Sequence, residues 1–161
     1  MQRLKFWRYD NDGIRALMSV NVHLARSGLE QSLLDLVYLR VSQLIGCSAC
    51  VDARARKAID HGLEQGQVDA VATWRERAFF DDRQRAALAW AETLTDVARS
   101  GVPDDVYAEA AGHFSEAEFV DLTLAIALSN AFARVGVAFN QGPPPEPALA
   151  KIDALVNRGG V

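Results

Sequence analysis

The spacing of apolar residues predicts helices along nearly the whole chain. Apolar side chains recur at three- and four-residue intervals over residues 12–27 and 33–44, and a glycine follows each stretch. This spacing places apolar side chains on one face of a helix, and glycine is favoured just past a helix C-terminus. A third helix is expected to begin at or near Cys47 and to run to Gly62. The period-two alternation of a half-buried strand does not recur, so the predicted fold class is all-α.

The middle of the chain has a shorter predicted helix, a connector and a stronger helix. The short helix covers about residues 64–73, and residues 74–80 form a polar connector around two aromatic anchors. Asp81 or Asp82 is then placed to cap an alanine-rich helix that continues through Val97. Aspartate is favoured at this position because its carboxylate accepts hydrogen bonds from the free N–H groups of the first turn.

A long apolar helix is predicted in the last third of the chain. Pro103 suits the first turn of a short helix before it. Ser115 and Glu118 form a capping box, with serine followed three residues later by glutamate. The helix that they open runs from Glu116 to about Phe139 and is apolar almost all round. Such a helix is expected at the centre of a fold or at a subunit interface.

The last predicted elements are a break and a weak helix. Glycine and three prolines at 141–145 end the long helix, and a weaker helix is expected through Ile152, Leu155 and Val156. The whole chain of 161 residues fits a single domain.

Composition and charge exclude several classes of partner. The net charge is −4 and the Lys and Arg residues are scattered, which gives no electrostatic reason to expect binding to nucleic acid or to an anionic membrane. No apolar run approaches the roughly 18 residues needed to span a bilayer. The first ten residues lack the apolar core and cleavage site of a signal peptide. We therefore expect a cytoplasmic protein.

The two cysteines, Cys47 and Cys50, are the candidate chemical centre. They lie three residues apart at a predicted helix start, and we interpret them as a redox-active dithiol. A structural disulfide across so short a loop would remove little entropy from the unfolded chain. Two alternatives are a metal site and a coincidental pair of buried thiols. A structural zinc site usually needs four ligands, and His23, His61 and His113 lack recognisable ligand spacing, so we expect no metal and no cofactor.

Two charged residues bear on the reactivity of these thiols. Cys47 at the helix start lies where the helix dipole favours a thiolate, and Cys50 is one turn on. Arg54 shares a helix face with Cys50 and would stabilise its thiolate, but an arginine cannot shuttle protons. Taken alone, Arg54 fits an exposed basic face over 54–57. Asp35 is an ionisable residue in an apolar stretch, and a solvated position is its alternative interpretation.

At this point the sequence resembles a known family. It is similar to the alkylhydroperoxidase D-like proteins of the carboxymuconolactone decarboxylase superfamily, and the similarity covers about residues 10–142, leaving a C-terminal tail at 143–161. The most specific part is the pattern Ser-Gln-x-x-Gly-Cys-x-x-Cys at residues 42–50. The segments that carry the resemblance are 33–53, 80–92 and 113–123.

The resemblance implies a fold, an assembly and an activity. The fold would be an all-helical bundle that assembles into trimers or hexamers. Its best-understood members reduce small hydroperoxides with the cysteine pair, and a thiol or a redox protein supplies the electrons. By position, Cys50 would attack the peroxide and Cys47 would resolve the product as a disulfide. The glutamate and histidine that relay protons in the family would correspond to Asp35 and Arg54.

Both relay positions depart from the family pattern, and this leaves alternatives. Either Arg54 holds Cys50 as a thiolate with Asp35 as its ion-pair partner, or the relay has decayed and turnover is weak. None of the histidines, including His61 two turns past Arg54, has an obvious claim to the missing position. The predicted function is a thiol-dependent peroxidase or reductase. The alternatives are a non-catalytic redox sensor or oligomeric scaffold, and an enzyme of the carboxymuconolactone decarboxylase type, which needs no cysteine pair.

Overall fold

The computed structural model describes residues 2–6, 9 and 11–142, and every regular element within them is helical. This confirms the predicted all-α class. The expected helix through residues 152–156 and the tail at 143–161 lie outside the described residues. The elements are α1 (Asp12–Leu24), α2 (Gln31–Ile45), α3 (Ser48–Asp60), α4 (Gln65–Ala70), the 3₁₀ helix η2 (Val71–Glu76), α5 (Asp82–Thr95), α6 (Val97–Ser100), α7 (Asp104–Gly112) and α8 (Glu116–Ala138).

The helix ends confirm the stop and start signals of the sequence. Gly46 follows α2 with φ 75°, the left-handed conformation that glycine adopts without steric cost. Asp81 caps α5. Its carboxylate accepts from the backbone N–H of Gln84, and the Gln84 side chain accepts from the backbone N–H of Asp81. Ser115 and Glu118 form the same reciprocal pair at the start of α8. These local rules fix where the major helices begin.

Three boundaries differ from the prediction. The first helix ends at Leu24 rather than near residue 27. The helix that begins after Asp81 stops before Val97, because Asp96 leaves the helical conformation and its carbonyl accepts hydrogen bonds that open α6. The expected connector at 74–80 is partly a 3₁₀ helix, in which Trp74 is buried and donates its indole N–H to Glu92 at 2.9 Å. A tertiary contact thus orders this segment.

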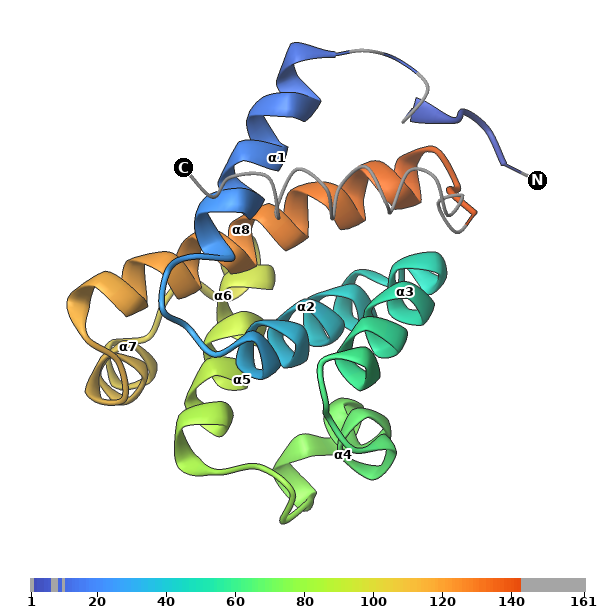
Figure 1. The fold of residues 1–161 in the computed structure, drawn as a ribbon. Helices are drawn as coiled ribbons and strands as arrows, with labels where there is room; N and C mark the ends of the chain where they lie inside the picture. Colours follow the sequence, from blue (N-terminus) through green and yellow to red (C-terminus); the bar gives the residue numbers. More distant parts are fainter. Residues whose placement is uncertain (1, 7–8, 10, 143–161) are drawn as a thin grey trace.

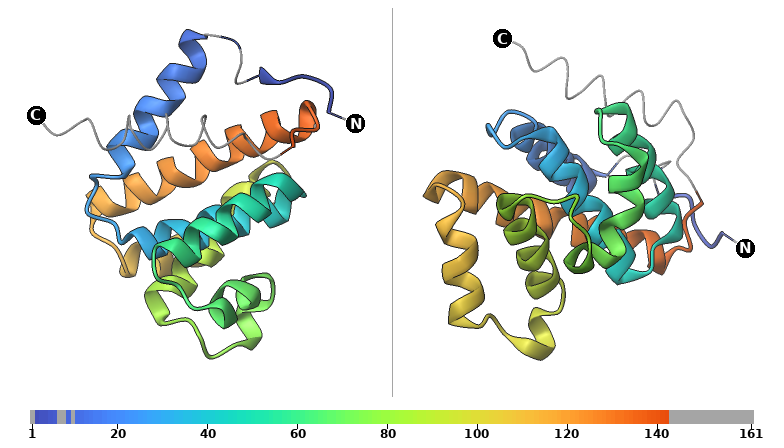
Figure 2. Two further views of the ribbon diagram at one scale, coloured as in Figure 1. Left: turned by 45° about the vertical axis from the view of Figure 1, so that its right-hand side comes forward. Right: turned by 90° about the horizontal axis from the view of Figure 1, so that it is seen from below.

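Helix α2 is the central element of the fold. One group of buried side chains joins α2 to α1, α5, α7 and α8, and a second joins its other side to α3, α4, η2 and α5. Helix α8 packs along α2 and is crossed by α1, while α3 lies antiparallel beside α2 (Figures 1 and 2). Because both sides of α2 are covered, nearly every residue from Leu33 to Ser42 is buried. A polar residue in this stretch is therefore held inside the fold.

Helix α8 is the longest helix among the described residues. Its 23 residues are long and apolar enough to cross a membrane by length and composition alone, and 44% of its most apolar window is buried inside the fold. Polar residues such as Asp121, Asn130 and Arg134 interrupt the helix, so the prediction that no uninterrupted apolar run approaches 18 residues still holds. In the fold, α8 packs against α1, α2 and α5. Val120, Leu124 and Val137 are exposed, so the helix is not buried all round.

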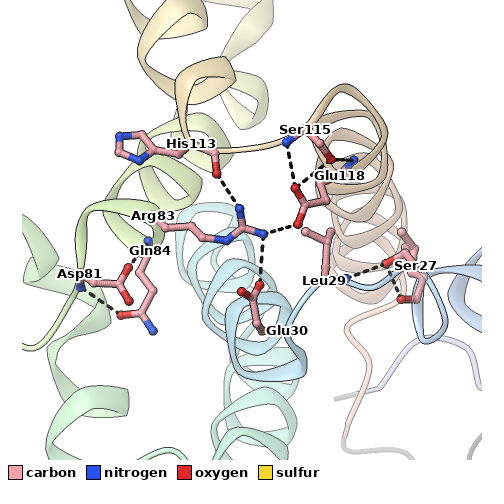
Figure 3. A network of polar contacts seen from close by, with 10 residues as sticks. Ser27, Leu29, Glu30, Asp81, Arg83, Gln84, His113, Ser115 and Glu118 are labelled. Carbon is pink, nitrogen blue, oxygen red and sulfur yellow. Dashed lines mark hydrogen bonds and ion pairs between the residues drawn. The ribbon is translucent and has the colours of Figure 1, made fainter.

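An arginine on α5 joins four segments at one end of the bundle (Figure 3). The Arg83 guanidinium donates to Glu118 at the start of α8 at 2.6 Å and to Glu30 before α2 at 3.3 Å. It also donates to the backbone carbonyl of His113, which follows α7, at 2.5 Å, and lies 4.2 Å from the centre of the Phe114 ring. This group, here called the Arg83 network, ties together helix ends that are distant in sequence.

Candidate functional site

The two cysteines form a disulfide at the start of α3. Cys47 is the residue before the first turn and Cys50 lies within that turn, with 5.2 Å between their Cα atoms. The bond confirms that the spacing brings the two sulfurs together. Within the described part of the chain, no group of three or more His, Cys, Asp and Glu side chains is arranged to hold a metal ion.

The two sulfurs differ in their access to solvent. Cys47 is 4% exposed, whereas Cys50 is only half-buried. No side chain caps the first turn of α3, because Cys47 occupies the position where a serine or aspartate oxygen usually accepts from the backbone N–H groups. A thiolate in this turn would therefore face a positive helix end. Cys50 is the more accessible of the two cysteines.

Helix α8 covers the inner side of the disulfide at Gly136. A Cβ atom at this position would lie 3.1 Å from the Cys47 sulfur and 3.3 Å from the Cys50 sulfur. Real Cβ atoms rarely approach other atoms so closely, and Gly136 is buried. The missing side chain is what lets α8 pack directly on the cysteine pair. Gly136 was not among the predicted site residues, and only its contact in three dimensions reveals it.

Arg54 lies one turn after Cys50 and stacks on an aromatic ring. Its guanidinium carbon is 4.5 Å from the centre of the Tyr38 ring, a cation–π contact across the α2–α3 pair. Burial lowers the pKa of Arg54 from its ordinary value, while Tyr38 and Asp35 act in the opposite direction. Even so, an arginine keeps its charge at physiological pH. Arg54 is half-buried and Arg56 is exposed, so the interpretation of Arg54 as part of an exposed basic face is wrong.

Tyr38 remains neutral beside this cation. The residue is 4% exposed, and burial raises the pKa of its phenol to about 12, with Arg54 opposing the shift and Asp35 adding to it. A phenol with this pKa does not ionise near neutral pH. Tyr38 therefore offers Arg54 the face of a ring and does not neutralise its charge.

Asp35 is buried and its carboxylate is held by two other side chains. The residue is 1% exposed, which excludes the solvated alternative. One carboxylate oxygen lies 2.6 Å from Nδ1 of His61, and the other accepts a hydrogen bond from Gln31 at 3.2 Å. Within the described residues, the carboxylate of Asp35 thus contacts His61 and Gln31, and it forms no direct ion pair with Arg54. Asp35 still acts on Arg54 through its field, since it raises the pKa of that arginine.

His61 is the site residue that the sequence reasoning missed. It follows Arg54 by seven residues and Cys50 by eleven. This spacing places the three side chains on one face of the helix, and it is the signal in the sequence that could have identified His61. At 1.5 Å per residue, His61 lies about 16 Å from Cys50 along the helix axis. Direct proton exchange between the two is therefore excluded. The other histidines pair elsewhere, His23 with Asp121 and His113 with Glu109.

Comparisons with known proteins identify the family and the fold. The model of the carboxymuconolactone decarboxylase family matches residues 13–93. The chain is 28% identical to the uncharacterised protein YdfG of Bacillus subtilis over 137 residues, which is 85% of this chain and 93% of that protein. It is 30% identical to a crystal structure from Agrobacterium tumefaciens, a protein of unknown function proposed there as the antioxidant defence protein AhpD. That match has a TM-score of 0.85 and covers 90% of this chain and 99% of the other.

A more distant structure shares the fold alone. The debrominase Bmp8, solved in complex with 2,3,4-tribromopyrrole, is 19% identical, with a TM-score of 0.72 over 89% of this chain and 78% of that one. The same helical arrangement therefore occurs in a protein whose name states a different reaction.

Proposed function

The chain belongs to the carboxymuconolactone decarboxylase family, as an alkylhydroperoxidase D-like member, and we propose that it is a thiol-dependent peroxidase that reduces small hydroperoxides. The observation that carries this proposal is the Cys47–Cys50 disulfide, in which Cys50 is the more exposed residue and lies one turn before Arg54, a cation that no carboxylate of the described residues pairs with. A dithiol at a helix start beside a cation is the environment that lowers a thiol pKa and makes the thiolate reactive.

The reaction begins with the reduced pair. The Cys50 thiolate attacks the terminal oxygen of the hydroperoxide, the O–O bond breaks, and an alkoxide leaves while Cys50 becomes a sulfenic acid. The Cys47 sulfur then attacks the Cys50 sulfur, releases the oxygen as water and forms the disulfide. An external thiol or a redox protein returns two electrons and two protons to the pair. One hydroperoxide is thus converted to one alcohol and one water for each dithiol oxidised.

The assignment of Cys50 to the attack rests on access and charge. Cys50 is half-buried, and Arg54 lies on its face of the helix one turn further on, whereas Cys47 is almost fully enclosed. Arg54 would stabilise the thiolate by Coulomb attraction and would not move a proton. Solvent at the exposed side of Cys50 supplies the proton that the leaving alkoxide needs. Asp35, held by His61 and Gln31, raises the pKa of Arg54 and so favours its charged form.

A second copy of the chain is the partner that the surface supports. Val120 and Leu124 are exposed apolar residues on one face of α8, and Val137 near its end is exposed as well; burying such side chains would be favourable. We propose assembly into a trimer or a hexamer in the cytoplasm. Sedimentation at micromolar concentration tests this, and a monomeric mass would contradict it.

The activity is tested with the Cys50→Ser and Cys47→Ser variants. Wild-type protein with dithiothreitol and cumene hydroperoxide is expected to turn over many times. Cys50→Ser should lose all activity above the uncatalysed rate. Cys47→Ser should consume one equivalent of hydroperoxide rapidly and then stop or turn over slowly, because it lacks the resolving thiol. A Cys50→Ser variant with full activity would refute the proposal, and a single oxidation without turnover in the wild type would indicate a redox sensor instead.

A further inference from the structure

A cavity lies at the C-terminal ends of α2 and α5, beside the short segment that leads from α2 to the cysteine pair. It has a volume of about 570 Å³ and is lined by residues from α2, α5, α6 and α8, together with Asp96 between α5 and α6. Neither cysteine, Arg54 nor Asp35 lines it. Cavities of this size accommodate small organic molecules. The proposed peroxidase cycle makes no use of this space.

Three arginines from three helices line the cavity, namely Arg40, Arg99 and Arg134. Two carboxylates line it as well, but both are engaged. Glu92 accepts from Arg40 at 2.7 Å and also from Arg75 and Trp74, which lie outside the lining. Asp96 is paired with Arg99 at 2.7 Å. The lining therefore carries one more positive charge than negative charge, although the whole chain has a net charge of −4.

Arg134 carries this excess charge. In the described part of the chain, its side-chain acceptor is the amide oxygen of Asn130, a neutral group. Asn130 is itself buried and donates to Thr95 at 3.0 Å and to the Ile126 carbonyl at 3.0 Å, which fixes the oxygen that holds the arginine. The guanidinium of this exposed residue thus lies beside the cavity, and no carboxylate of the described residues pairs with it. A planar guanidinium in this state is suited to bind a carboxylate by two parallel hydrogen bonds.

Another part of the lining is apolar. Leu44 and Ile45, at the end of α2, contribute their side chains, and Leu44 is 41% exposed. An exposed leucine beside an arginine-lined cavity offers a surface that an alkyl chain would cover favourably. We propose that this cavity binds a small organic carboxylate, with its head group on Arg134 and a short alkyl chain on Leu44 and Ile45. The proposal concerns a separate binding site and does not depend on the peroxidase activity.

Hexanoate is the probe, and hexanamide, which has the same chain without the charge, is the matched control ligand. Titration followed by ¹⁵N–¹H correlation NMR should give saturable shifts for Ile45 and Thr95 with hexanoate, and much smaller shifts with hexanamide. Arg134→Gln should weaken hexanoate binding about tenfold, since charge-assisted hydrogen bonds are lost. Leu44→Ala should weaken it less, and the exposed Arg26→Gln should leave it unchanged.

Three results would overturn the proposal. The first is the absence of saturable shifts with millimolar hexanoate. The second is equal binding of hexanoate and hexanamide, which would show that the charge contributes nothing. The third is unchanged hexanoate binding in Arg134→Gln, which would place the ligand elsewhere. Because no arm of the experiment measures hydroperoxide reduction, its outcome is separate from that of the peroxidase assay.

Discussion

Two arginines on different helices of this bundle, Arg83 on α5 and Arg54 on α3, have opposite surroundings. Arg83 donates to two carboxylates and a backbone carbonyl, and the resulting network joins the ends of α2, α5, α7 and α8. Arg54 faces the ring of Tyr38, and the nearby carboxylate of Asp35 is bonded to His61 and Gln31 instead. The positive charge of Arg83 is thus neutralised where helix ends meet. The positive charge of Arg54 is left to act on a negative charge at Cys50, one turn away.

The difference indicates how the fold separates stability from chemistry. Charge pairs that are neutralised and hydrogen-bonded hold segments together, as in the Arg83 network. An arginine whose carboxylate neighbour is bound elsewhere can act on an incoming or developing negative charge. His61 creates this situation, because it binds Asp35 and replaces the ion pair that the sequence predicts between Asp35 and Arg54. We therefore expect substitutions at the two arginines to separate cleanly into stability effects and reactivity effects.

The largest stability effect is expected for Arg83→Gln. The change leaves Glu118, Glu30 and the His113 carbonyl without their shared donor, and we expect a loss of about 2 kcal/mol in the free energy of unfolding. Urea unfolding measures it, with Arg26→Gln as the exposed control. The alkylation rate of reduced Cys50 should not change. If Arg83→Gln altered thiol reactivity as strongly as stability, the separation between the two arginines would fail.

A smaller loss, about 1 kcal/mol, is expected for Asp35→Asn. Asparagine keeps the shape and can still accept from Gln31, but it removes the charge that pairs with His61. With the carboxylate gone, the field of Arg54 at Cys50 is less opposed, so Cys50 alkylation at neutral pH should stay the same or become faster. A marked slowing would instead indicate that Asp35 takes part in proton transfer, as the family resemblance implies.

The Arg83 network also predicts a dependence of stability on acid. Hydrogen bonds from the Ser115 backbone, from Arg83 and from the Ser115 hydroxyl lower the pKa of Glu118 to about 2. A carboxylate with a lowered pKa adds stability that is complete above its unfolded pKa of about 4.3 and is lost as the pH falls towards 2. The difference in Tm between wild type and Glu118→Gln should be constant above about pH 5 and should shrink below it. A difference that stays constant down to pH 2 would contradict the assignment.

Local sequence signals were sufficient for most of the fold. The capping boxes at Asp81 and Ser115 and the glycine at position 46 act through neighbours within a few residues, so the chain alone reveals them. The break at Asp96 and the ordered turn around Trp74 were not predicted. Each depends on hydrogen bonds that compete with a continuous helix, and the sequence alone does not show which of the two forms in the folded structure.

The candidate site was predicted less completely than the fold. The spacing of Cys47 and Cys50 led directly to the disulfide. The partners of Asp35 could not be inferred, because His61 reaches it from 26 residues away through the packing of α3 on α2. Gly136 is more distant still, and the sequence carries no local signal that it packs against the sulfurs. Contacts between helices, rather than motifs within them, determine the electrostatics of this site.

The central claim is that Arg54 activates Cys50, and the pH dependence of Cys50 alkylation tests it most directly. The measurement uses reduced protein that carries Cys47→Ser, so that Cys50 is the only thiol. The pKa of Cys50 is measured in this protein, in the same protein with Arg54→Gln, and, as a control, in the same protein with Arg56→Gln at an exposed neighbouring position. We predict a Cys50 pKa below the ordinary thiol value of about 8.5 that rises in Arg54→Gln and is unchanged in Arg56→Gln. An ordinary Cys50 pKa that does not move when Arg54 is replaced would contradict the account.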